Sequence, residues 1–316
     1  MSVAAALPLP FDLSVAPDGY AWWYLDAIAD DGVHGLTVIF FIGSVFSPFY
    51  ARARRRGATP PEQHCAVNCI FYGPTRRWAF SEYDVHALSR DASHLAIGSS
   101  RMHWQGDRLE IVIDERCMPL PWPLRGALRV TPTPLVDCRV ALDSGAHHHW
   151  QPLAPRANVE VDMDTPALHW AGSGYLDSNH GDRPLERDFQ AWCWSRSVGD
   201  DDDTHVLYDV LPRDGQRRVH ALTFPAAGGF ASLTAPAPVA LPATSVWRMA
   251  RHTRSSSGVA RVCATWEDTP FYARSLIEHE LDGVTRRAVH ESLSLDRFTR
   301  PWVQRLLPFR ARRVGR

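Results

Sequence analysis

The sequence predicts an all-β protein with two successive antiparallel β-barrel-like domains and a short basic C-terminal tail. Short segments rich in aromatic and β-branched residues recur along the chain, and turns that contain glycine join several of them. No long segment with helical periodicity appears before residue 290. Many short strands joined by tight turns are typical of β-barrels and β-sandwiches.

Four hairpins are predicted from their turn signals. Asp30–Asp31–Gly32 and Arg213–Asp214–Gly215 are Asp-Gly turns between strand-like segments. Gly73–Pro74 and Gln105–Gly106–Asp107 mark two more turns. The four paired segments are 19–29 with 34–42, 64–73 with 77–85, 99–104 with 108–115, and 204–212 with 217–224.

A domain boundary is predicted near residue 155. One series of hairpins reaches about residue 150, and a comparable series resumes at about 157. The joining stretch QPLAPRAN is polar and contains two prolines, as linkers often do. We therefore expect domains over residues 1–155 and 156–295, with the tail over 296–316. The first domain could enclose a ligand cavity.

Composition excludes several classes of function. The 316 residues are 45% hydrophobic and 22% charged, which is typical of a soluble globular protein. A net charge of −1 argues against a general nucleic-acid binder. Six cysteines without a CxxC pair make a zinc ribbon improbable and fit a reducing compartment.

The sequence predicts no signal peptide and no transmembrane helix. The N-terminal stretch MSVAAALPLPFDLS lacks basic residues, and Pro8 and Pro10 interrupt it. The apolar run LTVIFFIGSVF is too short to span a bilayer. These features predict a cytoplasmic protein.

The tail is expected to form an interfacial segment facing anionic lipid. Phe298, Trp302 and Leu306 fall on one helical stripe. The alternative is a solvated, partly disordered C-terminus. The surrounding charges are Arg297, Arg300, Arg305, Arg310, Arg312, Arg313 and Arg316.

Two short stretches, GAHHHW (145–150) and GYLDSNHG (174–181), carry the candidate chemistry. Alternate residues of a strand share a face. His148 and Trp150 therefore point one way, and Tyr175 and Asp177 share a face of the second stretch. A buried aspartate is costly unless it is paired, coordinated or used.

Three interpretations of Asp177 remain open. A metal site is disfavoured because adjacent histidines on a strand cannot all turn to one ion; its ligands would come from His147, His148, His149, His180 and Asp182. A structural interpretation has Asp177 capping a turn over 178–181. In the third, an apolar setting keeps the Asp177 carboxyl protonated for acid catalysis.

Several longer motifs resemble those of the bacterial carotenoid 1,2-hydratases, the hydroxyneurosporene synthase family. The resemblance runs from about residue 18 to 295. It implies two tandem lipocalin-like β domains and a cofactor-independent addition of water to the terminal C1–C2 double bond of acyclic carotenoids such as neurosporene and lycopene. The motifs are GYAWWYLDA, HGLTVIFFIGSVFSPFY, HCAVNCIFYG, APRANVEV, SGYLDSNHGDRPLE, FQAWCWSR and EDTPFYARS.

The family's His-x-Trp and Tyr-x-Asp pairs fall on His148, Trp150, Tyr175 and Asp177. Our hypothesis gives Asp177 the role of general acid at C2, with the alternative that Asp177 and His148 exchange or share the acid and base roles. Trp150 and Tyr175 would stabilise the tertiary cation at C1, and His148 would position the water and accept its proton.

Other family-like residues are expected to shape a substrate pocket or hold the fold. Asp268 is also a second acid candidate, with capping of the turn before Pro270 as its alternative role. The residues are Trp22, Trp23, Tyr24, Phe46, Tyr50, Asn68, Trp192, Trp194, Asp268 and Tyr272.

The expected partners are an acyclic carotenoid, water, and the lipid of the inner (photosynthetic) membrane, which the protein would contact peripherally. Two other functions fit the same fold. One is a terpenoid or polyene cyclase, and the other is a non-enzymatic carrier of an apolar ligand.

Overall fold

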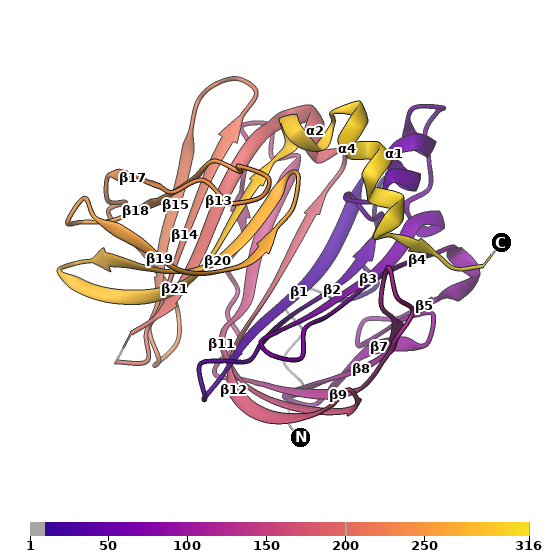
Figure 1. Cartoon of the computed structure of the whole chain (residues 1–316), viewed down its shortest axis with the longest axis horizontal. Coiled ribbons are helices and arrows are strands. Elements are labelled where there is room, and N and C mark those ends of the chain that lie inside the picture. Colours follow the sequence, from indigo (N-terminus) through magenta and orange to yellow (C-terminus); the bar gives the residue numbers. More distant parts are fainter. Residues whose placement is uncertain (1–9, 200, 316) are drawn as a thin grey trace. The chain divides into compact units, whose positions relative to one another are not determined.

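The computed structural model describes residues 10–199 and 201–315 (Figure 1). Most of residues 1–14, from which we predict the absence of a signal peptide, and Arg316 of the tail lie outside them. The chain divides into two compact units: the first holds the residues up to Pro184 together with Arg305 onward, and the second is Leu185–Gln304.

The first unit is built on one long sheet with strand order β22-β4-β3-β2-β1-β12-β11-β9-β8-β7-β6-β5, with β10 paired to β11, and its pairs are antiparallel except β22 with β4. Its strands are β1 Tyr20–Ala29, β2 Gly35–Ile42, β3 Cys65–Tyr72, β4 Arg77–Tyr83, β5 Leu88–Arg90, β6 His94–Ile97, β7 Ser100–Gln105, β8 Arg108–Arg116, β9 Pro123–Pro132, β10 Val140–Ala141, β11 His148–Thr165, β12 Ala167–Gly181 and β22 Arg312–Arg313.

The second unit has a sheet of order β16-β15-β14-β13-β21-β20-β19 and a separate β17-β18 pair. Its strands are β13 Phe189–Val198, β14 Thr204–Pro212, β15 Arg218–Phe224, β16 Ala231–Ser232, β17 Pro238–Leu241, β18 Arg251–Arg254, β19 Ala260–Asp268, β20 Tyr272–Leu281 and β21 Val284–Ser294.

Helices are few and short. The longest described helix has seven residues and is capped by Ser47, whose side chain accepts hydrogen bonds from two backbone N–H groups. The helices are α1 Pro48–Arg54, α2 Leu185–Asp188, α3 Leu295–Phe298 and α4 Pro301–Leu306, with 3₁₀ turns at Pro61–His64, Val85–Ala87 and Leu307–Phe309. The prediction of an all-β chain is confirmed, and so are the four hairpins.

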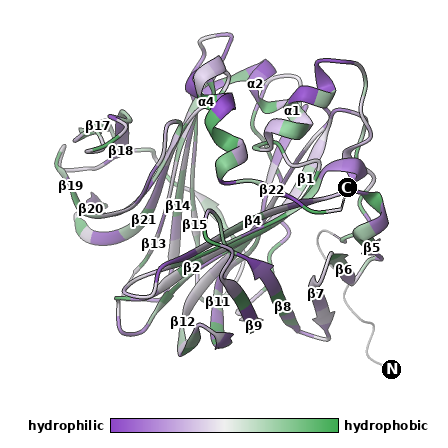
Figure 2. Cartoon of the chain, turned by 45° about the vertical axis from the view of Figure 1, so that its right-hand side comes forward, coloured by the Kyte–Doolittle hydropathy of each residue, from purple (hydrophilic) through white to green (hydrophobic). Residues whose placement is uncertain are grey.

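The first sheet curls so that one of its faces packs against itself. Trp23 and Leu25 of β1 belong to the same apolar core as Ile111 of β8 and Leu128 of β9. Strand β8 alternates buried and more exposed residues along its length, and Figure 2 shows hydrophobic and hydrophilic residues mixed along the strands. The inner face of the curled sheet is therefore occupied by packed side chains.

The division into units differs from the predicted boundary after residue 155, because β11 continues through that position. The pairing of β11 with β12 shifts register between Pro152 and Ala154 and again between Ala154 and Ala157. Proline cannot donate a ladder hydrogen bond and is tolerated at bulges. The polar, proline-containing stretch thus forms an irregular strand here.

The described part of the tail, residues 296–315, is folded, which contradicts the alternative of a partly disordered C-terminus. Phe298 is buried and packs on Phe271 with ring centroids 5.1 Å apart, so it does not share an exposed stripe with Trp302 and Leu306. Pro301 separates α3 from α4, which is why one continuous amphipathic helix does not form.

The end of the tail is bound to the first sheet. Strand β22 pairs in parallel with β4, and Arg313 Nη1 lies 2.9 Å from Glu82 Oε1. Glu82 is fully buried and also binds His64 Nδ1 at 2.8 Å. Among the described residues, no helix has the length and apolar character needed to cross a membrane.

Candidate active site

The candidate site lies on the face of β1, β11 and β12 that is opposite to the apolar core. In the register of β12 with β1, Asp177 is opposite Tyr24 and Tyr175 is opposite Asp26. In its register with β11, Asn179 is opposite Trp150. Leu176, between Tyr175 and Asp177, points instead into the core. The alternation of a pleated strand therefore places both members of the Tyr-x-Asp pair on the site face.

The Asp177 carboxyl receives two hydrogen bonds on one oxygen. Trp150 Nε1 donates to Asp177 Oδ2 at 2.9 Å, and Tyr175 OH donates to the same oxygen at 2.9 Å. Trp150 Nε1 also lies 3.2 Å from Tyr175 OH. Trp150 and Tyr175 are fully buried, and Asp177 is 5% exposed. Three of the four predicted catalytic residues thus form one compact group.

Tyr175 keeps its proton to a higher pH than an ordinary tyrosine does. Burial raises the pKa of Tyr175 well above its usual range, and the neighbouring Asp177 raises it further. The phenol therefore keeps its proton and directs it at the carboxyl of Asp177.

A second Tyr–Asp pair faces the first, and the sequence analysis missed its significance. Tyr24 OH donates to Asp26 Oδ2 at 3.4 Å, and the Tyr24 and Tyr175 ring centroids are 6.4 Å apart. Asp26 is fully buried. The signal was present, since the tripeptide Tyr-Leu-Asp occurs at 24–26 and again at 175–177. The two copies pair antiparallel, so each tyrosine stands opposite the other copy's aspartate.

His148 lies farther along the same face. It is fully buried, its Nδ1 is 3.0 Å from Tyr20 OH, and its ring stacks on Tyr20 at 5.8 Å. His148 is opposite Gly181, whereas Asp177 is opposite Pro152. Four residues of strand separate these positions, about 13 Å at 3.3 Å per residue.

The structure contradicts the idea that Asp177 caps a turn over 178–181. Strand β12 continues to Gly181, and residues 178–180 stay paired with both β1 and β11. The paired neighbours on both sides supply the hydrogen bonds that hold this segment extended, despite its turn-like composition.

The neighbouring histidines have separate partners. His147 Nδ1 lies 3.0 Å from Asp182 Oδ2, and His149 stacks on His180 at 5.0 Å. Burial and the nearby Arg139 lower the pKa of His180 to about 4. Within residues 10–199 and 201–315, no group of three or more His, Cys, Asp and Glu side chains is placed to hold a metal ion.

The expected pocket residues of the first unit fall into two sets. Trp22 and Tyr24 lie on the site face; Trp22 stacks on Tyr20 at 4.9 Å and has Phe46 at 6.3 Å. Trp23 points the other way and packs edge-on against Phe11 at 5.2 Å in the core.

Two further residues of that list make contacts that hold the fold. Tyr50 OH donates to Gly19 O at 2.7 Å, and Asn68 Oδ1 accepts from Trp78 Nε1 at 3.0 Å.

The remaining four expected pocket residues, Trp192, Trp194, Asp268 and Tyr272, belong to the second unit. Asp268 accepts hydrogen bonds from the backbone N–H groups of Val246 and Trp247. Asp268 therefore orders the loop at 246–247. The hydroxyl of Thr269 accepts a hydrogen bond from the backbone N–H of Tyr272 and so holds the turn between them.

Solved structures of other proteins share the fold of this mostly β chain. A putative AttH from Nitrosomonas europaea matches with a TM-score of 0.60 and 13% identity, over 87% of this chain and 92% of that one. Kievitone hydratase from Nectria haematococca matches with a TM-score of 0.53 and 10% identity, over 92% and 95%. At such low identity these matches show the fold alone.

Sequence relationships define the family more narrowly. The family model "Carotenoid hydratase CrtC" matches residues 38–316, and the chain belongs to this family. It is 50% identical over 307 residues to the acyclic carotenoid 1,2-hydratase of Thiocapsa roseopersicina, covering 96% of this chain and 76% of that protein. It is 40% identical over 281 residues to the enzyme of the same name from Cereibacter sphaeroides, covering 88% and 98%.

His180 makes the stability of this region depend on pH. Its pKa is about 4 in the folded protein and close to 6.5 when unfolded, so the unfolded chain binds the proton more readily. The stabilisation from neutral His180 is present above pH 6.5 and is lost as the pH falls toward 4. When the pH is lowered from 7.5 to 5, the free energy of unfolding measured by urea denaturation should fall less for His180→Gln than for the wild-type protein. The exposed His169→Gln variant serves as control, and an equal loss in all three proteins would contradict the assignment.

Proposed function

We propose that this protein is a carotenoid 1,2-hydratase that adds water to the terminal C1–C2 double bond of an acyclic carotenoid and forms a tertiary 1-hydroxy carotenoid. The observation that carries the proposal is the buried Asp177 with Trp150 and Tyr175 bound to one of its oxygens. The family membership and the relatives named acyclic carotenoid 1,2-hydratase support it.

The rate-limiting event in such a reaction is protonation of an alkene, which needs a strong, positioned acid. Burial disfavours the charged form of Asp177, whereas the hydrogen bonds from Trp150 and Tyr175 favour it. We place the transferable proton on the Asp177 carboxyl, whose Oδ2 both donors reach. Transfer of this proton to C2 leaves the carboxylate, whose Oδ2 is already solvated by the two donors, so the charge formed in the step is stabilised where it develops.

The carbocation formed at C1 needs stabilisation without a competing nucleophile. Trp150, Tyr175 and Tyr24 supply aromatic faces around the Asp177 carboxyl, and such faces attract a cation more strongly when water is excluded. Water then attacks C1 and loses a proton to a base, which restores a neutral product and completes the addition.

Two groups are candidates for that base. We retain His148 as the residue that positions the water and accepts its proton. Since the strand register separates it from Asp177 by about 13 Å, return of the proton to Asp177 requires carriers between them. The second candidate is Asp26, which stands opposite Tyr175 in the adjacent strand. The strand register therefore places its carboxyl group nearer to Asp177 than His148 is.

The finer features of the fold and localisation belong to the same proposal. We interpret the two units as tandem lipocalin-like domains, in keeping with the solved structures of the same fold. Trp302, Leu306 and Phe309 are 39%, 38% and 69% exposed and accompany several arginines. They suit peripheral contact of a cytoplasmic protein with the anionic membrane that would hold the substrate.

Replacing Asp177 by Asn removes the acid and keeps the shape. Hydration of lycopene in liposomes should fall about 10²–10⁴-fold, the range of general acid catalysis. Mass spectrometry of the wild-type product should show an addition of one water. An isomer of unchanged mass would indicate a cyclase, and bound but unaltered pigment would indicate a carrier. The matched control is Asp268→Asn, which makes the same change in an aspartate that orders a loop of the second unit. This variant should keep its hydration activity.

Asp26→Asn and His148→Gln separate the two candidate bases. The variant that removes the base should lower kcat about 10²-fold or more, and it should abolish the corresponding limb of the pH–rate profile. If Asp26→Asn loses activity and His148→Gln keeps it, Asp26 is the base. The reverse result would identify His148 as the base. Near-normal activity of both variants would contradict a protein base at either position. Circular dichroism of each variant checks that the buried site still folds.

A further inference from the structure

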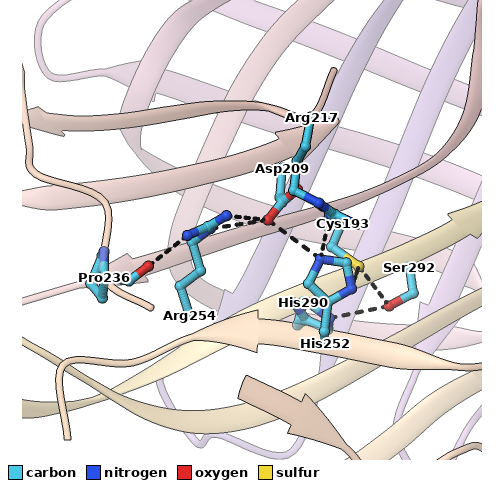
Figure 3. A network of polar contacts seen from close by, with 8 residues as sticks. All are labelled: Cys193, Asp209, Arg217, Pro236, His252, Arg254, His290 and Ser292. Atoms are coloured by element: carbon cyan, nitrogen blue, oxygen red, sulfur yellow. Dashed lines mark hydrogen bonds and ion pairs between the residues drawn. The ribbon is translucent and has the colours of Figure 1, made fainter. Parts of the chain in front are cut away.

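The second unit contains a buried chain of cysteine, histidine and aspartate that the hydration chemistry does not use (Figure 3). Cys193 lies on β13, Asp209 on β14 and His252 on β18. Cys193 Sγ is 3.4 Å from His252 Nδ1, and His252 Nε2 is 3.4 Å from Asp209 Oδ2. One imidazole therefore bridges a thiol and a carboxylate, the arrangement that activates cysteine nucleophiles.

The carboxylate is held in its charged form. Arg254 Nε and Nη2 lie 3.0 Å and 2.9 Å from Asp209 Oδ2, and Arg217 Nη1 lies 2.5 Å from Oδ1. Burial alone would raise the pKa of Asp209, but hydrogen bonds from His252 and Arg217 outweigh it and lower the pKa to about 2. Asp209 is thus a fixed anion behind His252.

The imidazole is correspondingly biased toward its protonated form. Hydrogen bonds to Asp209 and then to Cys193 raise the pKa of His252 to about 9. Arg217 opposes this bias, because its Nη1 lies 3.1 Å from His252 Nε2. Both arginines are already engaged with Asp209, so the carboxylate offsets part of their charge.

The sulfur has two more polar neighbours. Ser292 is directly opposite Cys193 in the pairing of β13 with β21, and its Oγ lies 3.4 Å from Sγ. His290 Nε2 lies 3.2 Å from that Oγ. Burial alone would raise the pKa of Cys193, but hydrogen bonds from His252 and His290 lower it to about 5.

The other five cysteines show the opposite behaviour, which provides an internal comparison. Burial raises the pKa of each of them, to about 11 for Cys138. Cys263 is the most open of them, yet its pKa is raised as well. The most exposed thiol is therefore not the one with the lowered pKa. Cys193 is only 6% exposed but contacts the His252 imidazole, whereas the more exposed Cys263 has a raised pKa. The other raised thiols are Cys65, Cys69 and Cys117.

We propose that Cys193 is a modification site, a thiolate paired with His252 that hydrogen peroxide oxidises to sulfenic acid. The His252 side chain, whose Nδ1 lies 3.4 Å from Sγ, is 30% exposed, and the proposal includes the approach of a small uncharged oxidant to the sulfur beside this imidazole.

The reaction balances with residues at the site. The thiolate attacks one peroxide oxygen, so an S–O bond forms and the O–O bond breaks. Sulfur loses two electrons, and the departing hydroxide takes the proton of the His252 imidazolium and leaves as water. The product carries a neutral sulfenic acid beside a neutral imidazole, so oxidation removes the ion pair that links β13 to β18.

The test uses the intact protein treated with hydrogen peroxide at pH 6.5 in the presence of dimedone, followed by peptide mass spectrometry. The adduct should appear on Cys193, and its rate should change little between pH 6.5 and 8. His252→Gln should lower the Cys193 rate at pH 6.5 at least tenfold, whereas Cys263→Ser should leave it unchanged.

A second reagent makes the result independent of how well the variant folds. Iodoacetamide at pH 6.5 should alkylate Cys193 of the wild-type protein at least tenfold faster than Cys263, although Cys263 is the more exposed. Preferential labelling of Cys263 or an absent dimedone adduct at Cys193 would overturn the proposal. So would a Cys193 rate that rises with pH as steeply as that of Cys263.

Discussion

The pairing of β12 with β1 on one side and β11 on the other is the constraint on which the candidate site depends. Asp177 meets Trp150 because β12 is in register with β11, and it stands opposite Tyr24 because of the register with β1. Tyr175 reaches it from two residues earlier on β12 itself. A slip of one residue would turn Asp177 into the apolar core and bring Leu176 to the site. The opposite face of the same strands is filled by packed apolar side chains, which makes such a slip costly and so fixes the register.

Buried ionisable groups in the two units follow the same rules with different outcomes. Burial penalises the charged form in every case, and local hydrogen bonds decide how far the penalty is offset. At Asp177 the donors are an indole and a phenol, neither of which carries charge. At Asp209 they are the His252 imidazole and the guanidinium groups of Arg217 and Arg254, and the carboxyl stays ionised. Under the proposed function, this difference in donor type allows Asp177 to exchange a proton, whereas Asp209 remains an anion.

Much of the fold and part of the site could be predicted from the sequence. Two-residue periodicity and Gly-containing turns are local, so the strands and hairpins followed from them directly. The same periodicity put Tyr175 and Asp177 on one face. The domain division could not be predicted in this way, because Pro152 and Pro155 mark a linker and a bulged strand equally well. Nor could the turn-like residues 178–181 be recognised as strand, since pairing on both sides overrides their local preference.

The site residues that were missed depend on pairing between segments distant in sequence. Asp26 gains its meaning only when β1 and β12 are aligned, although the repeated Tyr-Leu-Asp tripeptide was visible beforehand. Cys193, Asp209 and His252 lie on three different strands, and no spacing rule connects them. Tertiary pairing, which the sequence does not display, creates both clusters.

The protonation state of Asp177 is the most direct test of the central claim that a buried acid supplies the proton. Infrared spectroscopy of the folded protein near neutral pH, compared with Asp177→Asn, isolates the carbonyl stretch of a protonated carboxylic acid at this position. We expect a band from neutral Asp177 that disappears in the Asn variant and shifts in Trp150→Phe, where one hydrogen bond to Oδ2 is removed. An Asp177 that is ionised throughout the pH range of hydration activity would contradict it.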